Sequence, residues 1–147
     1  MKVLLVNPTQ ENVYGRRILP PYPPLGLLYI ASSLSEARYE VEVLDWDCDL
    51  ASATLFRRCL RDHRPDLVGI TSTTPQIGSA FSIARMVKET TGAWVVLGGA
   101  HASALPREVI SNEFVDFVVV GEGEETVKEL VLGLRRGSFE GIHGLWY

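Results

Sequence analysis

The sequence has few cysteines, and the two that it has are not arranged as a metal-binding pair. Cys48 and Cys59 are the only cysteines among 147 residues, and no Cys-x-x-Cys spacing joins them to a partner. A metal centre built on them is therefore not expected. We expect both to be unreactive thiols, with Cys59 packed on a helix face and Cys48 in a loop.

The sequence also lacks a long hydrophobic run and an excess of positive charge. The apolar run that begins at Val3 ends after four residues at Asn7-Pro8, which is too short for a signal-peptide core or a membrane span. We therefore expect a cytoplasmic protein without a membrane partner. The net charge is −4 and the basic residues are scattered, so no nucleic-acid partner is expected. A small molecule is the expected ligand.

Motifs of several common ligand sites are missing as well. The first apolar run meets Asn7-Pro8-Thr9-Gln10 instead of a glycine-rich dinucleotide loop, and no P-loop follows any strand-like run. The third run ends in Thr71-Ser-Thr-Thr74, where a phospho-receiver domain would carry an aspartate. These absences argue against nucleotide-binding and receiver domains. A non-catalytic flavodoxin-like module that binds flavin or no ligand remains an alternative, although the first loop lacks a Ser/Thr-rich phosphate turn.

What the sequence does contain is a regular alternation of strand-like and helix-like segments. Apolar or alternating runs predict strands at 3–6, 39–45, 67–71, 94–97 and 117–120. Helices are expected over about 24–38, over 51–63 and over 124–136. Two more are expected, one from a Thr74 cap to a stop at Gly92 and one from a Ser103 cap to residue 110. This alternation predicts an α/β fold, a flavodoxin-like (Rossmann-like) doubly wound sheet of five parallel strands in a three-layer αβα sandwich. The second segment alternates polar with apolar residues, which favours the edge position of the order 2-1-3-4-5.

Glycines and small polar residues follow three of these strands. Gly98 and Gly99 remove two Cβ atoms where the fourth strand ends, which would let a bulky ligand lie against the main chain. The carboxyl ends of neighbouring parallel strands meet at one rim of the sheet, where open α/β sheets bind ligands. We expect a valine at Gly99 to block such a ligand without harming the fold.

Five segments taken in order carry a family resemblance. They are Val3-Leu-Leu-Val-Asn-Pro8, Pro23-Pro-Leu-Gly-Leu-Leu-Tyr-Ile-Ala31, Arg64-Pro-Asp-Leu-Val-Gly-Ile70, Val96-Leu-Gly-Gly-Ala-His-Ala102 and Val120-Gly-Glu-Gly-Glu124. With them the chain resembles the N-terminal cobalamin (B12)-binding domain of B12-dependent radical S-adenosylmethionine (SAM) enzymes. Among these, it looks most similar to the anaerobic magnesium-protoporphyrin IX monomethyl ester cyclase type.

The resemblance implies a cobalamin-binding domain at residues 1–137, followed at 138–147 by a terminal strand or the start of a linker. The linker would lead to a radical SAM domain of the same chain, which would hold S-adenosylmethionine and a [4Fe-4S] cluster. Two isolated cysteines cannot supply the Cys-x-x-x-Cys-x-x-Cys motif of that cluster, so these 147 residues are not expected to be catalytic alone. The whole enzyme would act in methyl transfer or in oxidative cyclisation, with a tetrapyrrole as one candidate substrate.

The resemblance also implies a site. The corrin ring would lie over the carboxyl rim of the sheet, and the nucleotide tail would reach among the ends of the third, fourth and fifth strands. Hydroxyl groups and backbone N–H groups there could bond corrin amides or the tail phosphate. The alternative is that these segments are only tight turns between strands and helices. The expected cofactor-binding residues are Asn7, Pro8, Leu25, Gly26, Ser72, Thr73, Thr74, Gly98, Gly99, Ala100, His101, Ala102, Gly121, Glu122, Gly123 and Glu124.

No histidine is expected on cobalt. Cobalamin domains of the methionine synthase type carry Asp-x-His-x-x-Gly after the first strand, whereas residues 7–24 contain no histidine here. The lower cobalt position would be empty, occupied by water or shielded by apolar side chains such as Leu25. His101 beside the glycines has three open roles, which are bonding the ligand's tail, bonding locally within a turn, and binding cobalt. His63 and His143 are expected at the surface.

The apolar fifth strand would form the second edge of the sheet, and such an edge invites association. We expect the terminal segment 142–147 to cover it as an extra strand, in preference to a second copy of the domain or a catalytic domain.

Overall fold

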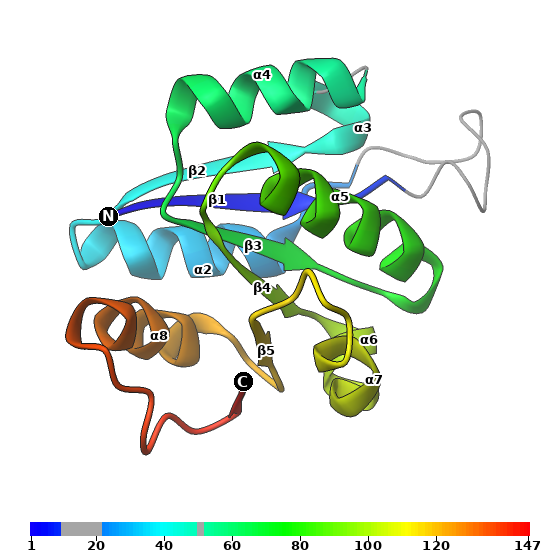
Figure 1. The fold of residues 1–147 in the computed structure, drawn as a ribbon. Helices are drawn as coiled ribbons and strands as arrows, with labels where there is room; N and C mark the ends of the chain where they lie inside the picture. The colour runs from blue at the N-terminus through cyan, green and yellow to red at the C-terminus, as the bar shows by residue number, and fades with distance from the viewer. Residues whose placement is uncertain (10–21, 50–51) are drawn as a thin grey trace.

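The computed structural model describes residues 1–9, 22–49 and 52–147, and this part of the chain forms one mixed sheet covered on both faces by helices (Figure 1). The sheet has the order β2-β1-β3-β4-β5-β6. Strands β1 to β5 are parallel, which confirms the predicted α/β fold and the order of the first five strands. The strands are β1 (Lys2–Asn7), β2 (Glu40–Asp45), β3 (Leu67–Thr71), β4 (Trp94–Gly98), β5 (Phe117–Val119) and β6 (Leu145–Trp146).

Helices form the two outer layers. One layer consists of α2 (Leu25–Glu36) and α8 (Glu124–Arg136), and the other contains α4 (Ala53–His63) and α5 (Ile77–Thr90), as Figure 1 shows below and above the sheet. The short helices α3 (Trp46–Asp49), α6 (Ala100–Ala104) and α7 (Pro106–Ile110) complete the described helices together with the 3-10 turn η1 (Thr74–Gln76). None of the helices in these ranges is both long and apolar enough to cross a membrane.

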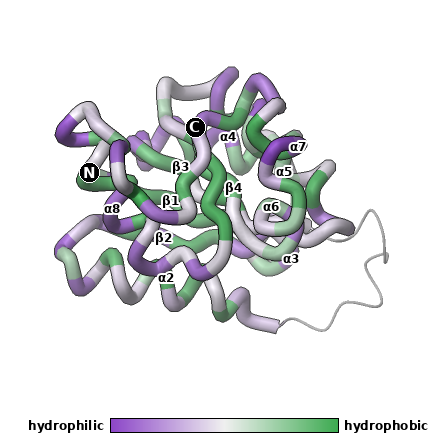
Figure 2. The backbone as a smooth tube through the Cα atoms, turned by 90° about the horizontal axis from the view of Figure 1, so that it is seen from below, coloured by the Kyte–Doolittle hydropathy of each residue, from purple (hydrophilic) through white to green (hydrophobic). Residues whose placement is uncertain are grey.

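Alternate side chains of the central strands enter two separate cores. Leu4 and Val6 of β1 pack with the α4 and α5 layer, whereas Val3 and Leu5 pack with α2 and α8. A strand buried on both faces needs apolar residues at every position, which is why residues 3–6 are a continuous apolar run. In the hydropathy view of Figure 2, β3 and β4 are hydrophobic at the centre of the fold. The alternating β2 lies at an edge, as predicted.

Some predicted details differ from the structure. Thr73, and not Thr74, caps η1 through reciprocal bonds with Gln76, and α5 then begins at Ile77. Ser103 does not cap a helix, because it lies inside α6, where its hydroxyl accepts a bond from the Gly121 N–H at 3.0 Å. The segment predicted as one helix is divided at Leu105, and Pro106 opens α7.

The two cysteines also lie in different surroundings. Cys59 is half-buried on α4 against the core, as expected, and this burial raises the pKa of its thiol, with Glu42 and Asp62 adding to the shift. Cys48 is exposed and lies in α3, so its placement in a loop was wrong.

The end of the chain returns to the sheet as the expected extra strand. Gly137 ends α8 in the left-handed region at φ 74°, and the chain reverses so that β6 pairs antiparallel with β5. The Val120 N–H donates to the Gly144 carbonyl at 2.8 Å, and Phe139 packs its ring against those of Phe117 and Tyr147. The terminal segment therefore covers the apolar edge of β5.

Candidate functional site

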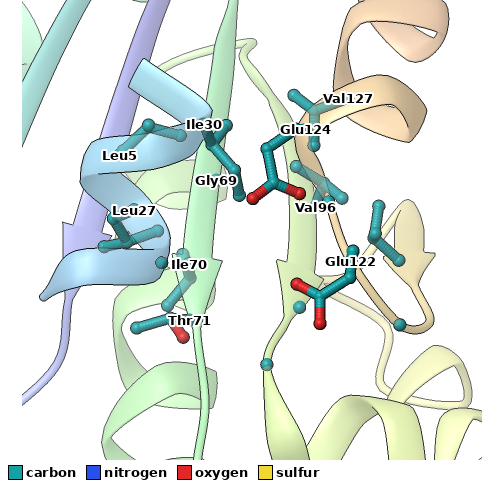
Figure 3. A pocket seen from close by; sticks show the side chains of 16 residues that line it. Leu5, Leu27, Ile30, Gly69, Ile70, Thr71, Val96, Glu122, Glu124 and Val127 are labelled. Atoms are coloured by element: carbon teal, nitrogen blue, oxygen red, sulfur yellow. The ribbon is translucent and has the colours of Figure 1, made fainter. Parts of the chain in front are cut away.

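A cavity lies at the carboxyl ends of β3, β4 and β5, on the sheet face that α2 and α8 cover. Its volume is about 150 Å³. Aliphatic side chains from the strands and from both helices form most of its wall (Figure 3). They are Leu5, Leu27, Ile30, Val96, Val119 and Val127, and Ile70, whose side chain packs in the other core, also borders the cavity.

Glycines keep this cavity open. Gly26 in the first turn of α2 lines it, and a Cβ atom added there would have no heavy atom within 4 Å. A Cβ atom on Gly98 would make only an ordinary contact, 3.8 Å from the Val119 carbonyl oxygen. Gly69 lies in the middle of β3, where a Cβ atom would come within 2.8 Å of the Leu5 Cδ2 atom. The bare backbone at Gly26 and Gly98 thus leaves open space beside the cavity.

Gly99 has a different role, and the expectation that a valine there would spare the fold is wrong. Its φ is +92°, which an L-residue rarely adopts, and its added Cβ atom would lie 2.8 Å from both the Ser72 carbonyl oxygen and the Thr71 hydroxyl. The Gly99 backbone is pressed against the end of β3. Gly99 is therefore needed for the fold itself.

Two carboxylates provide the charge of the cavity. Glu122 is exposed and Glu124 is half-buried, and Figure 3 shows the carboxylate of Glu124 between Ile30 and Val96. No Lys, Arg or His is among the described residues that line the cavity. The described part of the lining can thus accept hydrogen bonds but presents no cation to an anionic group.

The three hydroxyls predicted at the end of β3 bond within the protein. The fully buried Ser72 donates to the Gly98 carbonyl at 3.0 Å, and the Thr73 hydroxyl donates to Gln76 at 2.9 Å. The Thr74 hydroxyl lies 3.2 Å from the Nδ1 atom of His101. None of the three lines the cavity. Their observed contacts hold the strand ends together.

The site residues predicted at the end of β1 also bond within the protein. The buried Gln76 side chain donates to the Asn7 side chain at 3.1 Å and to the Pro8 carbonyl at 2.7 Å. Leu25 is exposed at the start of α2 and does not line the cavity. Outside the cavity lining too are Ala100, which is exposed, and Ala102, which is fully buried. Residues 10–21 of the first loop lie outside the described residues.

His101 is buried and does not line the cavity. Its ring is 6% exposed, bonds to Thr74 through Nδ1, and places Nε2 at 3.9 Å from a carboxylate oxygen of Glu108. Nε2 has no hydrogen-bond partner among the described residues. The contacts observed for the ring are thus with Thr74 and Glu108 of the protein itself. His63, paired with Glu42 at 2.9 Å, and His143 are both exposed.

The cavity thus brings together Gly26, Gly98, Gly99, Gly121, Glu122, Gly123 and Glu124 of the predicted residues. Sequence reasoning missed the aliphatic wall and the floor, namely Leu5, Leu27, Ile30, Gly69, Ile70, Thr71, Val96, Val119 and Val127. The wall residues are indistinguishable in sequence from ordinary core residues. Gly69 carried a usable signal, because a glycine inside a strand marks a close approach of other atoms.

Known proteins are similar to this chain in sequence and fold. The chain is 38% identical over 150 residues to an uncharacterized methyltransferase of Pyrococcus horikoshii, covering 100% of this chain and 32% of that protein. It is 31% identical to the anaerobic magnesium-protoporphyrin IX monomethyl ester cyclase of Cereibacter sphaeroides, covering 95% of this chain and 23% of that enzyme.

A solved structure is similar as well. The radical S-adenosylmethionine methyltransferase TsrM of Kitasatospora setae, with cobalamin and a [4Fe-4S] cluster bound, superposes with a TM-score of 0.79 at 29% identity. The match covers 98% of this chain and 26% of that enzyme. Across these three proteins, the chain spans between 23% and 32% of the relative's length.

The family model of the B12 binding domain matches residues 11–131, which is most of the chain. This match confirms the resemblance that the five sequence segments indicated, and cobalamin is the cofactor after which the family is named. The chain belongs to the B12 binding domain family.

Proposed function

We propose that residues 1–137 bind cobalamin as one domain of a larger radical SAM enzyme, with the corrin ring over the carboxyl rim and the base of the nucleotide tail in the cavity. The observation that supports this best is the cavity itself, which joins aliphatic walls to bare glycine backbone at the strand ends. The residues present fit the cofactor, because apolar walls suit the base of the tail and the glycines allow a large ring to approach. Residues 138–147 would be the terminal strand of this domain.

The larger enzyme would carry S-adenosylmethionine and a [4Fe-4S] cluster on a further domain of the same chain. Methyl transfer is the activity we favour, because the Pyrococcus relative and TsrM are both named as methyltransferases. Oxidative cyclisation of a tetrapyrrole is the second candidate, supported by the 31% identity to the magnesium-protoporphyrin ester cyclase. When bound, cobalamin would supply the methyl-carrying or redox-active cobalt, and this chain's residues would hold and orient it.

A glycine pair gives a matched test of the binding site. Gly26 and Gly78 are each the second residue of a helix, and an added Cβ atom at either meets nothing within 4 Å, but only Gly26 lines the cavity. Leucine stabilises both helix starts relative to glycine, so neither Gly26→Leu nor Gly78→Leu should harm the fold. We expect Gly26→Leu to weaken hydroxocobalamin binding about tenfold or more by filling the cavity mouth, and Gly78→Leu to leave it unchanged.

The measurement is an absorption titration with hydroxocobalamin, repeated with flavin mononucleotide. Equal affinities of the two variants for cobalamin would show that the site is misplaced. Preference of the wild type for flavin would instead support the flavodoxin-like alternative.

We further propose that cobalt bound here has no protein imidazole. Support comes from the lack of histidine at residues 7–24 and from the ring of His101, which contacts Thr74 and does not line the cavity. The electron paramagnetic resonance spectrum of the Co(II) form should therefore lack axial nitrogen splitting. Splitting that is present in the wild type and disappears in His101→Ala would contradict the proposal.

A further inference from the structure

The outward face of α2 is apolar where the helix begins. Leu27 and Leu34 are buried against the sheet, whereas Leu25, Leu28 and Tyr29 are 60%, 41% and 64% exposed. The exposed residues are three and four positions apart, so their side chains are neighbours on one face of the helix. Together these three residues form what we call the α2 patch.

The sequence of α2 also differs from that of helices covered on one side only. Residues 25–35 include no charged side chain. Helices α4 and α8 carry exposed charges such as Arg58 and Glu129, and among the described residues each exposes one large apolar side chain, Leu55 or Leu132. A helix that is apolar on all sides is normally buried on all sides. The composition of α2 therefore indicates a helix with a second covering layer.

The α2 patch lies at the carboxyl rim, next to the cavity. Gly26, Leu27 and Ile30 line the cavity and stand between the patch residues in sequence (Figure 3). Further along α2 the outward residues are polar, with Ser32 and Ser35 exposed. The exposed apolar surface of α2 is thus confined to the end that borders the proposed cobalamin site.

We propose that the α2 patch is an interface with the rest of the same polypeptide, namely the further domain that carries S-adenosylmethionine in the proposed function. The chain spans only 23% to 32% of the relatives named above, so most of each relative lies outside the matched segment. The further domain must reach the carboxyl rim to act with the cofactor, and the patch borders that rim.

The character of the patch favours such a permanent contact. Interfaces between parts that are always together are more apolar than those of partners that come and go. The patch has no charge that would steer a transient partner. This inference rests on the proposed function and names the surface on which its further domain docks.

The test measures hydroxyl-radical labelling of side chains by mass spectrometry, in the 147-residue chain and in the full-length gene product, both free of cobalamin. The shorter chain can be compared because it has its own core on each face of the sheet. We expect labelling of Leu28 and Tyr29 to fall about fivefold or more in the full-length protein, since a packed interface excludes water. Leu55 on α4, which is 45% exposed, is the matched control and should be labelled equally in both proteins.

A pair of substitutions gives a second measurement. Leu28→Gln/Tyr29→Gln removes apolar surface and keeps a high helix propensity. It should leave the thermal unfolding temperature of the 147-residue chain unchanged and lower that of the full-length protein. Leu55→Gln should change neither.

Equal labelling of the patch in the two proteins would overturn the inference. Protection that hydroxocobalamin alone produces in the 147-residue chain would also overturn it, because the cofactor would then be the occupant. Protection that grows with the concentration of the 147-residue chain would do the same in favour of a second copy. Each of these results leaves cobalamin binding intact. The hydroxocobalamin titration tests the proposed function separately, and a full-length protein that binds no cobalamin would overturn that function even if the patch is covered.

Discussion

Neighbouring glycines at the rim differ in what their missing side chains permit. Gly98 has an ordinary backbone conformation and borders the cavity. The absence of its side chain therefore enlarges the space at the cavity. Gly99 combines a positive φ with a backbone contact to the end of β3. The two are adjacent in the same Gly-Gly sequence, and only the path of the chain in space distinguishes them.

This difference predicts unequal effects on stability. Gly99→Ala should lower the free energy of unfolding by about 1–3 kcal/mol, because the alanine must adopt a strained φ and press against Ser72. Gly98→Ala should change it by less than about 0.5 kcal/mol, since its Cβ atom has room. Urea unfolding of both variants measures the difference. Equal stability of the two would mean that the chain relaxes at Gly99 and that the contact with β3 is not needed.

At the scale of elements, the sequence predicts the strands and their order because each pattern has a direct physical cause. A continuous apolar run, as in Val3 to Val6, suits a strand between two helical layers. The alternating β2 can only be half-covered, and the structure places it at the edge. The acidic start of α8 and Gly137 at its end are equally local signals, and they fix its ends correctly.

The connections were predicted less well, because their polar groups bond to residues distant in sequence. Nothing near Gln76 in the sequence shows that its buried side chain reaches back to Asn7 and Pro8. The same Gln76 side chain accepts a hydrogen bond from the Thr73 hydroxyl, at the start of the 3-10 turn. From the sequence alone, the hydroxyl groups of residues 72–74 were therefore expected to be free to contact a ligand. A buried polar group must find a partner, but the sequence does not say which one.

For the whole molecule, the rim was predictable and the cavity was not. Parallel strands bring their carboxyl ends together by topology alone, so the glycine-rich ends of β4 and β5 had to meet at one rim. Which face of the sheet holds the cavity depends on how α2 and α8 pack against each other and over Gly69. That packing places Leu27, Ile30 and Val127 in the wall. The sequence likewise does not show that the His101 ring contacts Thr74 and does not line the cavity.

The terminal segment offers a test at the same scale. Residues after α8 close the sheet through two β6 pairs, and Thr126 holds the segment by donating to the His143 carbonyl at 3.0 Å. Deletion of residues 141–147 would bare the backbone of Val118 and Val119 at an apolar edge, and such an edge pairs readily with another chain. The truncated protein should therefore become a concentration-dependent oligomer or precipitate, with a lower thermal unfolding temperature.

Light scattering over a range of concentrations measures the association, and removal of Tyr147 alone is the control because it leaves both strand pairs in place. The truncated protein is expected to associate through β5, because the backbone of Val118 and Val119 loses its pairing with β6. A truncated chain that stays monomeric, with unchanged thermal stability, would show that β6 contributes nothing to the domain. In that case residues 138–147 would be the start of a linker, and the apolar edge of β5 would be stable without a covering strand.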